Sequence, residues 1–237
     1  CPSVMISIII PAWNEEKYLP KLLDCIKRQD YRDYEIIVAD AGSTDKTKQI
    51  ARKYGCKIVN SGSLPGIGRN NGAKAAKGRI LLFLDADVLL DDDLLKNAVE
   101  EFEKRKLDCA SVKIIPQGNK IIDKVFLGAF NSWVIATQNF YPHAIGACIF
   151  CRKELHKKIK GFDEKIAVAE DMDYVKRCSK YGKFRILKNA KIFFSMRRYD
   201  HHGHFNVAAK IILGEIHRVF AGELKKDVFN YQVRYRK

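Results

Sequence analysis

Short apolar runs alternate with amphipathic segments along the first half of the chain. Runs compact enough for buried strands cover residues 7–10, 35–40, 57–59 and 79–84. Between them apolar residues recur three or four positions apart, most clearly at Leu19, Leu22, Leu23 and Ile26, which is the spacing of a helix packed on one face. Strands alternating with helices are typical of an α/β fold, so we predict a mostly parallel sheet flanked by helices.

The expected helices begin near polar residues or glycines. Asn14, just beyond the proline that is expected to end the first strand, can cap the first helix, and the turn at residues 42–45 leads into the second. A loop with two glycines at 65–68 precedes a helix expected over 69–77, and another helix is expected over 91–104.

The pattern changes after a strand expected at residues 110–115. Residues 121–140 are apolar and aromatic with single polar interruptions, and a strand-like run follows at 144–151. Two short strands are expected at 184–187 and 191–194, and the remainder reads as helical and basic.

Composition limits the classes of partner. The 237 residues have a formal net charge of +15, which fits either a solvated lysine-rich surface or an anionic partner such as a nucleotide, a lipid phosphate or a membrane surface. Basic residues are dispersed among acids without a nucleic-acid-binding motif, so no nucleic acid partner is expected. The sequence lacks an uninterrupted apolar stretch of about 18 residues and a signal peptide, and we therefore expect a cytoplasmic protein.

Cysteine usage points the same way. The seven cysteines are odd in number and lie mostly in apolar segments, which favours reduced, buried thiols over a disulfide framework. Cys148 and Cys151 have the spacing of a metal-binding pair, but no second Cys or His pair follows at zinc-finger spacing. Zinc binding by this pair is therefore the less favoured interpretation.

The strand at 79–84 runs directly into Asp85-Ala86-Asp87. Because side chains alternate along an extended chain, both carboxylates are expected on one side of the strand end. Two hard anionic oxygens suit a divalent cation, and the cation in turn suits a diphosphate. Asp40 ends the second strand and is expected at the same edge of the sheet, where α/β proteins bind ligands.

Other polar residues at these strand ends are compatible with nucleotide binding. Asp40 can accept a ribose hydroxyl or a base N–H, while Ser43 can also serve as a helix cap. Asn14 and Glu15 can hold a base or ribose, although a helix cap and a first-turn acid explain them as well. Arg69 follows glycines at an expected helix start, a combination that attracts phosphate.

Residues 170–173, Glu-Asp-Met-Asp, form an acidic cluster in a basic half of the chain. Acids exposed at a helix start are the ordinary explanation. A general base close to an acceptor hydroxyl is the sharper one, and we assign that role to Asp171 with Glu170 and Asp173 as supporting acids.

Arg197 and Arg198 precede three histidines within residues 201–204. The arginines can neutralise a leaving diphosphate and a histidine can complete a metal site, whereas a polar surface loop explains the same residues equally well. Together with the carboxylates, these residues suit displacement at a carbon that bears a phosphate leaving group.

Several ordered stretches resemble the family 2 glycosyltransferases, which have a GT-A fold. They are SIIIPAWNE at 7–15, VADAGSTD at 38–45, GRNNG at 68–72, LFLDAD at 82–87, GFDE at 161–164 and EDMD at 170–173. The resemblance covers most of the chain and implies a Rossmann-like GT-A sheet in a single domain, 1–237. Residues 1–115 would form the nucleotide-sugar-binding half and 116–237 the acceptor-binding and catalytic-base half.

The resemblance implies an inverting, metal-assisted transfer from a nucleotide-diphosphate sugar of UDP or GDP type. The residues that it places in the nucleotide-sugar site are Pro11, Asn14, Glu15, Asp40, Ser43, Arg69, Asp85, Ala86 and Asp87. Asp85 and Asp87 would form the DxD pair that binds Mg²⁺ or Mn²⁺, and Asp171 would be the catalytic base. Arg197 and Arg198 resemble a basic pair near the diphosphate or acceptor. The chain departs from the pattern at Ala41, where an acidic residue is common, which leaves the base of the donor open.

The acceptor is expected near residues 121–140 and the basic carboxyl-terminal stretch. Candidates are a glycan, a small molecule and a polyprenyl-phosphate lipid. Six apolar residues recur near helical spacing, namely Phe205, Ala208, Ala209, Ile212, Ile216 and Val219. A helix packed on the core explains them, and so does a helix resting on anionic lipid at the inner face of the membrane, helped by Lys225, Lys226, Arg234, Arg236 and Lys237.

Two other classes of protein stay open. A sugar-1-phosphate nucleotidyltransferase also holds a nucleotide and a metal on an α/β sheet, but it would have a glycine-rich loop with a lysine where this chain has PAWNEE. A non-catalytic nucleotide-binding or lipid-surface module is the second.

Overall fold

A computed structural model describes residues 4–144 and 146–225, except for the side chains of residues 215, 216, 219 and 221. Within these residues the strands are β1 (Ile6–Ala12), β2 (Tyr34–Asp40), β3 (Lys57–Asn60), β4 (Ile80–Leu84), β5 (Leu89–Leu90), β6 (Cys109–Pro116), β7 (Cys148–Arg152) and β8 (Phe184–Phe194). The helices are α1 (Leu19–Arg28), α2 (Thr47–Lys53), α3 (Pro65–Ala75), α4 (Leu94–Lys104), α5 (Ile121–Thr137), α6 (Lys153–Lys158), α7 (Glu170–Tyr181), α8 (Arg197–His202) and α9 (His204–Ala221).

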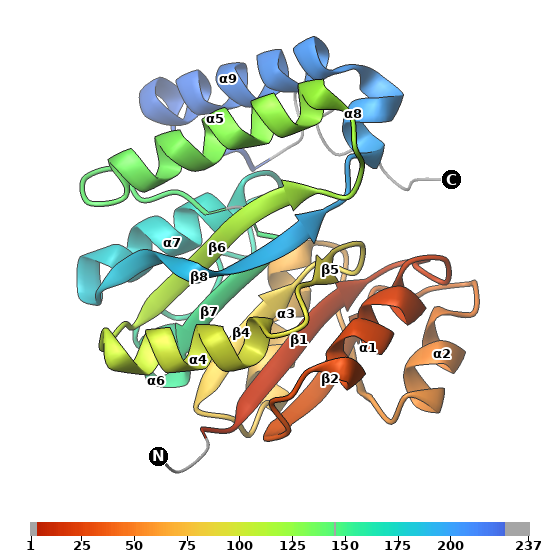
Figure 1. Cartoon of the computed structure of the whole chain (residues 1–237). Coiled ribbons are helices and arrows are strands. Elements are labelled where there is room, and N and C mark those ends of the chain that lie inside the picture. The colour runs from red at the N-terminus through yellow and green to blue at the C-terminus, as the bar shows by residue number, and fades with distance from the viewer. Residues whose placement is uncertain (1–3, 145, 226–237) are drawn as a thin grey trace.

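The strands form one eight-stranded sheet in the order β3-β2-β1-β4-β7-β6-β8-β5 (Figure 1). The first four strands of the chain are mutually parallel, and β6 is parallel to β8. Antiparallel pairing is confined to β7 with its two neighbours and to β5 with β8. The predicted α/β class with a mostly parallel sheet is therefore confirmed.

The core has two parts because alternate strand residues face opposite sides of the sheet. Ile8 and Ile10 of β1 pack in one apolar cluster, whereas Ile9 packs in the other. The same alternation separates Cys148 from Cys151, so these two residues cannot share a metal ion. The six described cysteines are free and buried, as the sequence predicted; Cys1 lies outside the described residues.

β1 continues through Pro11, although the sequence suggested that the strand would end there. The backbone N–H of Ala41 donates to the Ala12 oxygen, so the backbone polar groups of Ala12 point toward β2. Those of Pro11, the preceding residue, therefore point toward β4. The ladder to β4 has already ended at Ile9, opposite Phe83, so the missing N–H of the proline costs no ladder hydrogen bond.

Asn14 does not cap α1, which begins five residues later without a side-chain cap. Its backbone is left-handed (φ 54°), and its side-chain oxygen accepts the N–H of Thr44 at 2.9 Å. Its own N–H donates to Ser43 Oγ at 3.0 Å. Asn14 and Ser43 thus join the loops that follow β1 and β2, which fixes the spacing between these two strand ends.

α3 begins at Pro65, so the two expected loop glycines lie inside the helix. Proline is favoured at a helix start because its missing N–H would have no helical partner. Further along α3, a Cβ on Gly72 would lie 2.4 Å from Ile9 Cγ2. Glycine is therefore required for the helix to pack this closely on β1.

The two strands expected near residues 184–194 are one strand, β8, and its pairing with β6 shifts register between Ser111 and Lys113. The backbone N–H groups of Lys188 and Asn189 donate to the Glu101 carboxylate on α4. Both groups thus have hydrogen-bond acceptors where the strand pairing is interrupted.

Residues 121–137 form α5, which lies with α9 beyond the β6–β8 part of the sheet (Figure 1). His204 at the start of α9 bonds the buried Asp123 on α5.

Candidate active site

A cavity of about 880 Å³ opens at the carboxyl ends of the parallel strands. Its walls include residues that follow β1, β2, β3 and β4, the start of α7, and α8. Helices α5 and α9 add an apolar wall with Phe126, Phe130, Ile211 and Ile212. The cavity lies at the edge of the sheet where α/β proteins bind ligands.

Arg69 connects two other expected site residues, Asp85 and Glu170. It is 3% exposed, and its Nη2 lies 2.9 Å from Asp85 Oδ1 after β4. Its Nη1 bonds the Glu170 carboxylate at the start of α7. The Gly146 carbonyl, 3.4 Å from Nη2, is a further acceptor. Arg69 was expected to attract phosphate at a helix start, but its guanidinium contacts two carboxylates. It thereby links the loop at residues 85–87 to the start of α7.

Arg197 of α8 joins two further acids, Glu15 and Asp87. Its Nε lies 2.9 Å from Asp87 Oδ2, and its Nη2 lies 3.1 Å from Glu15 Oε1. Burial raises the pKa of both carboxyls above the usual value, although Arg197 acts against this shift in each. Arg198 also lines the cavity, close enough to favour the charged form of Asp87.

Asp171 lines the cavity beside Glu170. Its Oδ2 accepts the N–H of Gly146, and its Oδ1 accepts the N–H of Met172 at 2.9 Å. Burial raises the pKa of Asp171 above its usual value, against the opposing effects of Arg69 and these two N–H groups. A carboxylate with a raised pKa at a cavity wall has the properties of a general base.

Four of the expected site residues stand away from the cavity wall. The backbone N–H of Asn14 donates to the Ser43 hydroxyl, which joins the loops after β1 and β2. Asp173 forms an ion pair with Arg177, one turn further along α7. Asp40 is 6% exposed, and its Oδ2 accepts the N–H groups of residues 42 and 43. Its Oδ1 is buried and has no hydrogen-bond partner among the described residues, so it is available to a donor entering beside Ala41.

Pro11, Glu15, Arg69, Asp85, Ala86, Asp87, Glu170, Asp171, Arg197 and Arg198 all line the cavity. The sequence singled out residues 121–140, which contain the α5 part of the wall, but it missed Gly146. A Cβ on Gly146 would lie 2.9 Å from both Arg69 Nη2 and Asp171 Oδ2. Nothing in the local sequence marks this glycine, because the contacts join segments 25 and 77 residues apart.

The DxD pair has the donor chemistry for Mg²⁺ or Mn²⁺. Arg69 engages Oδ1 of Asp85 and Arg197 engages Oδ2 of Asp87, and the Asp85 side chain is 37% exposed. Both residues thus present a hard carboxylate oxygen for a cation. His201 and His202 line the same cavity, whereas His204 bonds Asp123. Among the described residues, no histidine forms a compact three-ligand group with these acids.

A family model described as "Glycosyl transferase family 2" matches residues 7–160, and the chain belongs to that family. The predicted resemblance is therefore confirmed.

Among curated relatives, poly(ribitol-phosphate) beta-N-acetylglucosaminyltransferase TarS of Staphylococcus aureus is 36% identical over 118 residues, covering 46% of this chain and 20% of the relative. A Methanococcus voltae relative, dolichyl N-acetyl-alpha-D-glucosaminyl phosphate 3-beta-D-2,3-diacetamido-2,3-dideoxy-beta-D-glucuronosyltransferase, is 27% identical over 212 residues, covering 80% of this chain and 66% of the relative. The chain thus spans about a fifth of the first of these relatives.

Solved structures share the fold. Residues 1–349 of S. aureus TarS in complex with UDP-GlcNAc match with a TM-score of 0.67 and 22% identity, covering 98% of this chain and 76% of that one. The mannosyltransferase PcManGT of Pyrobaculum calidifontis, in complex with GDP-Man and Mn²⁺, matches with a TM-score of 0.72 and 19% identity, covering 95% and 66%. Within the described residues, no helix combines the length and the apolarity needed to cross a bilayer.

Proposed function

We propose that this chain is an inverting glycosyltransferase that moves a sugar from a nucleotide-diphosphate sugar to an acceptor hydroxyl or lipid phosphate, with assistance from a divalent cation. The observation that supports it most is the convergence of Glu15, Asp85, Asp87 and Asp171 on one cavity at the strand ends. Family membership favours this function over a nucleotidyltransferase or a non-catalytic module.

In this proposal the half at 1–115 binds the donor. Asp40 Oδ1 accepts a base N–H, and Pro11, Asn14, Glu15 and Ser43 shape the nucleotide pocket. Relatives with the fold bind UDP-GlcNAc and GDP-Man, so we propose a donor of UDP or GDP type.

Asp85 and Asp87 would hold Mg²⁺ or Mn²⁺, with Ala86 between them in contact with the sugar nucleotide. When bound, the cation neutralises charge on the departing diphosphate. Arg197 and Arg198 lie beside the same pair and supply further positive charge to the leaving group.

The half at 116–237 would supply the base and the acceptor site. Asp171 removes the proton of the incoming hydroxyl, and its raised pKa strengthens it for that task. Glu170 holds Arg69, which orients the DxD loop. A hydroxyl deprotonated on the face of the sugar opposite the diphosphate attacks in line, which inverts the anomeric carbon.

The apolar wall favours an acceptor with an apolar portion, such as a polyprenyl-phosphate lipid, over a plain glycan or a small polar molecule. Beyond the cavity, several large apolar residues of α5 and α9 are exposed, namely Ile121, Val125, Phe205 and Phe220. We therefore propose that these helices rest on an anionic membrane surface, helped by lysines such as Lys210. The side chains of Ile216 and Val219, and residues 226–237, also considered for this contact, lie outside what the structure describes.

A thermal-shift panel of UDP, GDP, CDP and dTDP, with and without Mn²⁺, tests the donor site. One nucleotide is expected to raise the melting temperature only when Mn²⁺ is present, because a ligand that binds only the folded state stabilises it. The matching sugar nucleotide should then release its nucleoside diphosphate on turnover. Asp87→Ala should abolish the Mn²⁺-dependent shift, and an unchanged shift in that variant would refute the metal site.

A further inference from the structure

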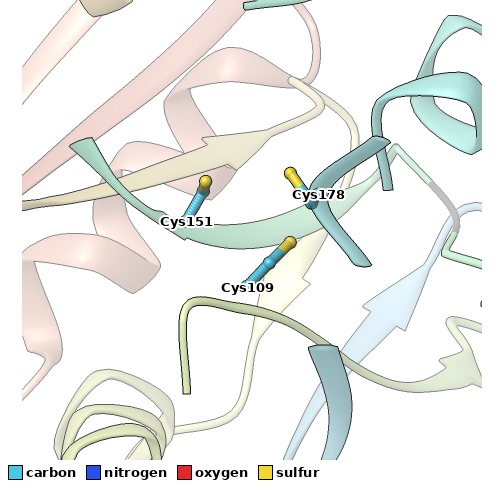
Figure 2. A group of neighbouring side chains, drawn as sticks. All are labelled: Cys109, Cys151 and Cys178. Atoms are coloured by element: carbon cyan, nitrogen blue, oxygen red, sulfur yellow. The ribbon is translucent and has the colours of Figure 1, made fainter. Parts of the chain in front are cut away.

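Three cysteines from separate elements meet in the core, away from the cavity. Cys109 begins β6, Cys151 lies on β7 and Cys178 on α7 (Figure 2). All three are fully buried, and their sulfur atoms lie within 4.8 Å of one another. Within the described part of the chain, this is the one compact group of three or more potential metal ligands.

The sheet itself brings two of the thiols together. Cys109 and Cys151 are directly opposite each other in the antiparallel β6–β7 pair. The N–H of Arg152 donates to the Asp108 oxygen at 2.8 Å, which identifies Cys109–Cys151 as a non-hydrogen-bonded pair, the kind with the closest side chains. Helix α7 then places Cys178 beside both sulfurs.

These separations fit one ion. With metal–sulfur bonds of about 2.3 Å, sulfur atoms around a three- or four-coordinate ion lie roughly 3.8–4.0 Å apart. Small side-chain rotations reach that spacing from the observed arrangement. Sulfur ligands select soft cations and disfavour Mg²⁺ or Ca²⁺.

A second layer of polar groups surrounds the sulfurs. The Cys151 thiol donates to the Arg152 carbonyl oxygen at 3.4 Å, and the Tyr174 hydroxyl near Cys151 lies 2.9 Å from His156 Nδ1. The Tyr174 ring stacks on Phe162 at 3.8 Å between ring centres, which fixes the hydroxyl. Polar groups in such an outer layer are typical of metal sites.

We propose that Cys109, Cys151 and Cys178 bind one thiophilic cation, Zn²⁺ or Cu⁺, that fastens α7 to the sheet. Each thiol that becomes a ligand releases its proton, and no electron is transferred. Because the sulfurs have no exposed surface, the ion enters while β6, β7 and α7 assemble. Cys178 lies seven residues beyond Asp171 on the same helix, so the ion would hold the helix whose first turn lines the cavity.

The test refolds the reduced 237-residue chain without oxygen in the presence of Zn²⁺, Cu⁺, Mg²⁺ or no metal. After desalting, elemental analysis should find one Zn²⁺ or one Cu⁺ per chain and no Mg²⁺. When the chain is refolded with Zn²⁺ and Cu⁺ together, the ion that is retained in the larger amount is the preferred one. The retained ion should raise the melting temperature by about 5–10 °C at a hundredfold excess over its dissociation constant. Cd²⁺ should produce an ultraviolet thiolate-to-metal charge-transfer band.

Cys178→Ala should abolish metal retention. The matched control is Cys148→Ala, because Cys148 is equally buried on the same strand as Cys151 but faces the other side of the sheet. It should retain one ion. The wild-type chain decides the matter even where a variant fails to fold: no retained ion and no Cd²⁺ band would overturn the proposal. So would loss of two titratable thiols to a Cys109–Cys151 disulfide in the freshly isolated protein, or equal loss of metal in both variants.

Discussion

Two arginines pair with four of the carboxylates in the site. Arg69 contacts Asp85 and Glu170, and Arg197 contacts Glu15 and Asp87. A buried charge without a partner is costly, so these pairs allow several acids to share one hollow. In the proposed metal site Asp85 and Asp87 would hold the cation, and Arg197 beside Asp87 would be placed to pair with the diphosphate.

Asp171→Asn tests the proposed base. The amide cannot accept the acceptor's proton, so turnover should fall by about 10²- to 10⁴-fold. Nucleotide binding should stay unchanged, because the proposed role of Asp171 is toward the acceptor hydroxyl and not toward the nucleotide. The measurement is nucleoside diphosphate release beside a thermal shift with nucleotide. Asp173→Asn is the matched control, since Asp173 lies on the same helix but pairs with Arg177. Equal losses in both variants would contradict the assignment to Asp171.

Stability should depend on pH through the same carboxyl. Burial raises the pKa of Asp171 in the folded protein above the usual value of 3.8. The folded state therefore binds its proton more tightly than the unfolded chain, and the free energy of unfolding falls as pH rises from that value. The Asp171→Asn variant has no carboxyl to titrate at this position, so its stability does not fall for this reason. The melting temperature of the variant minus that of the wild type should therefore increase from acid to neutral pH. A difference between the two that stays constant over that range would count against a raised pKa.

At the scale of elements, close packing of α3 on β1 fixes the height of Arg69 above the strand ends. Gly72→Ala should destabilise the fold by about 1–3 kcal/mol, because its Cβ would overlap Ile9 in a packed core. Gly128→Ala is the control, since a Cβ there meets nothing within 4 Å on α5. It should be neutral or stabilise by up to about 1 kcal/mol. Urea unfolding of both variants decides between these outcomes, and equal effects would contradict the packing argument.

At the scale of the whole molecule, α5 and α9 expose large apolar residues beside the apolar wall that they give to the cavity. The chain should therefore float with anionic vesicles at low salt and release as salt screens its net charge of +15. Phe205→Ser with Phe220→Ser should reduce the bound fraction by more than about tenfold, since each buried Phe contributes roughly 1.5–3 kcal/mol.

The control for this surface is Tyr181→Ser, which removes an exposed aromatic residue of α7. Vesicle binding should survive that change. Absence of flotation by the wild type at low salt, or equal loss in the control, would remove the membrane proposal while leaving the donor site intact.

The local pattern of the chain determined most of the elements and the edge of the sheet at which the site lies. Alternating apolar runs and helical stripes depend on neighbours a few residues apart, and the carboxyl ends of parallel strands necessarily meet at one edge. Asp85 and Asp87 could therefore be placed from the sequence. Boundaries near Pro11, Pro65 and the start of β7 could not, because each depends on what the adjacent strand or helix offers.

Tertiary structure alone decided which side chains pair. Glu15 meets Arg197 across 182 residues, whereas Asp173 turns from its acidic neighbours to Arg177. Cys151 lies beside Cys109 and Cys178, whereas Cys148, three positions away in the sequence, packs on the other side of the sheet. Strand register and helix orientation set these contacts, and both result from packing over the whole core, so no short stretch of sequence encodes them.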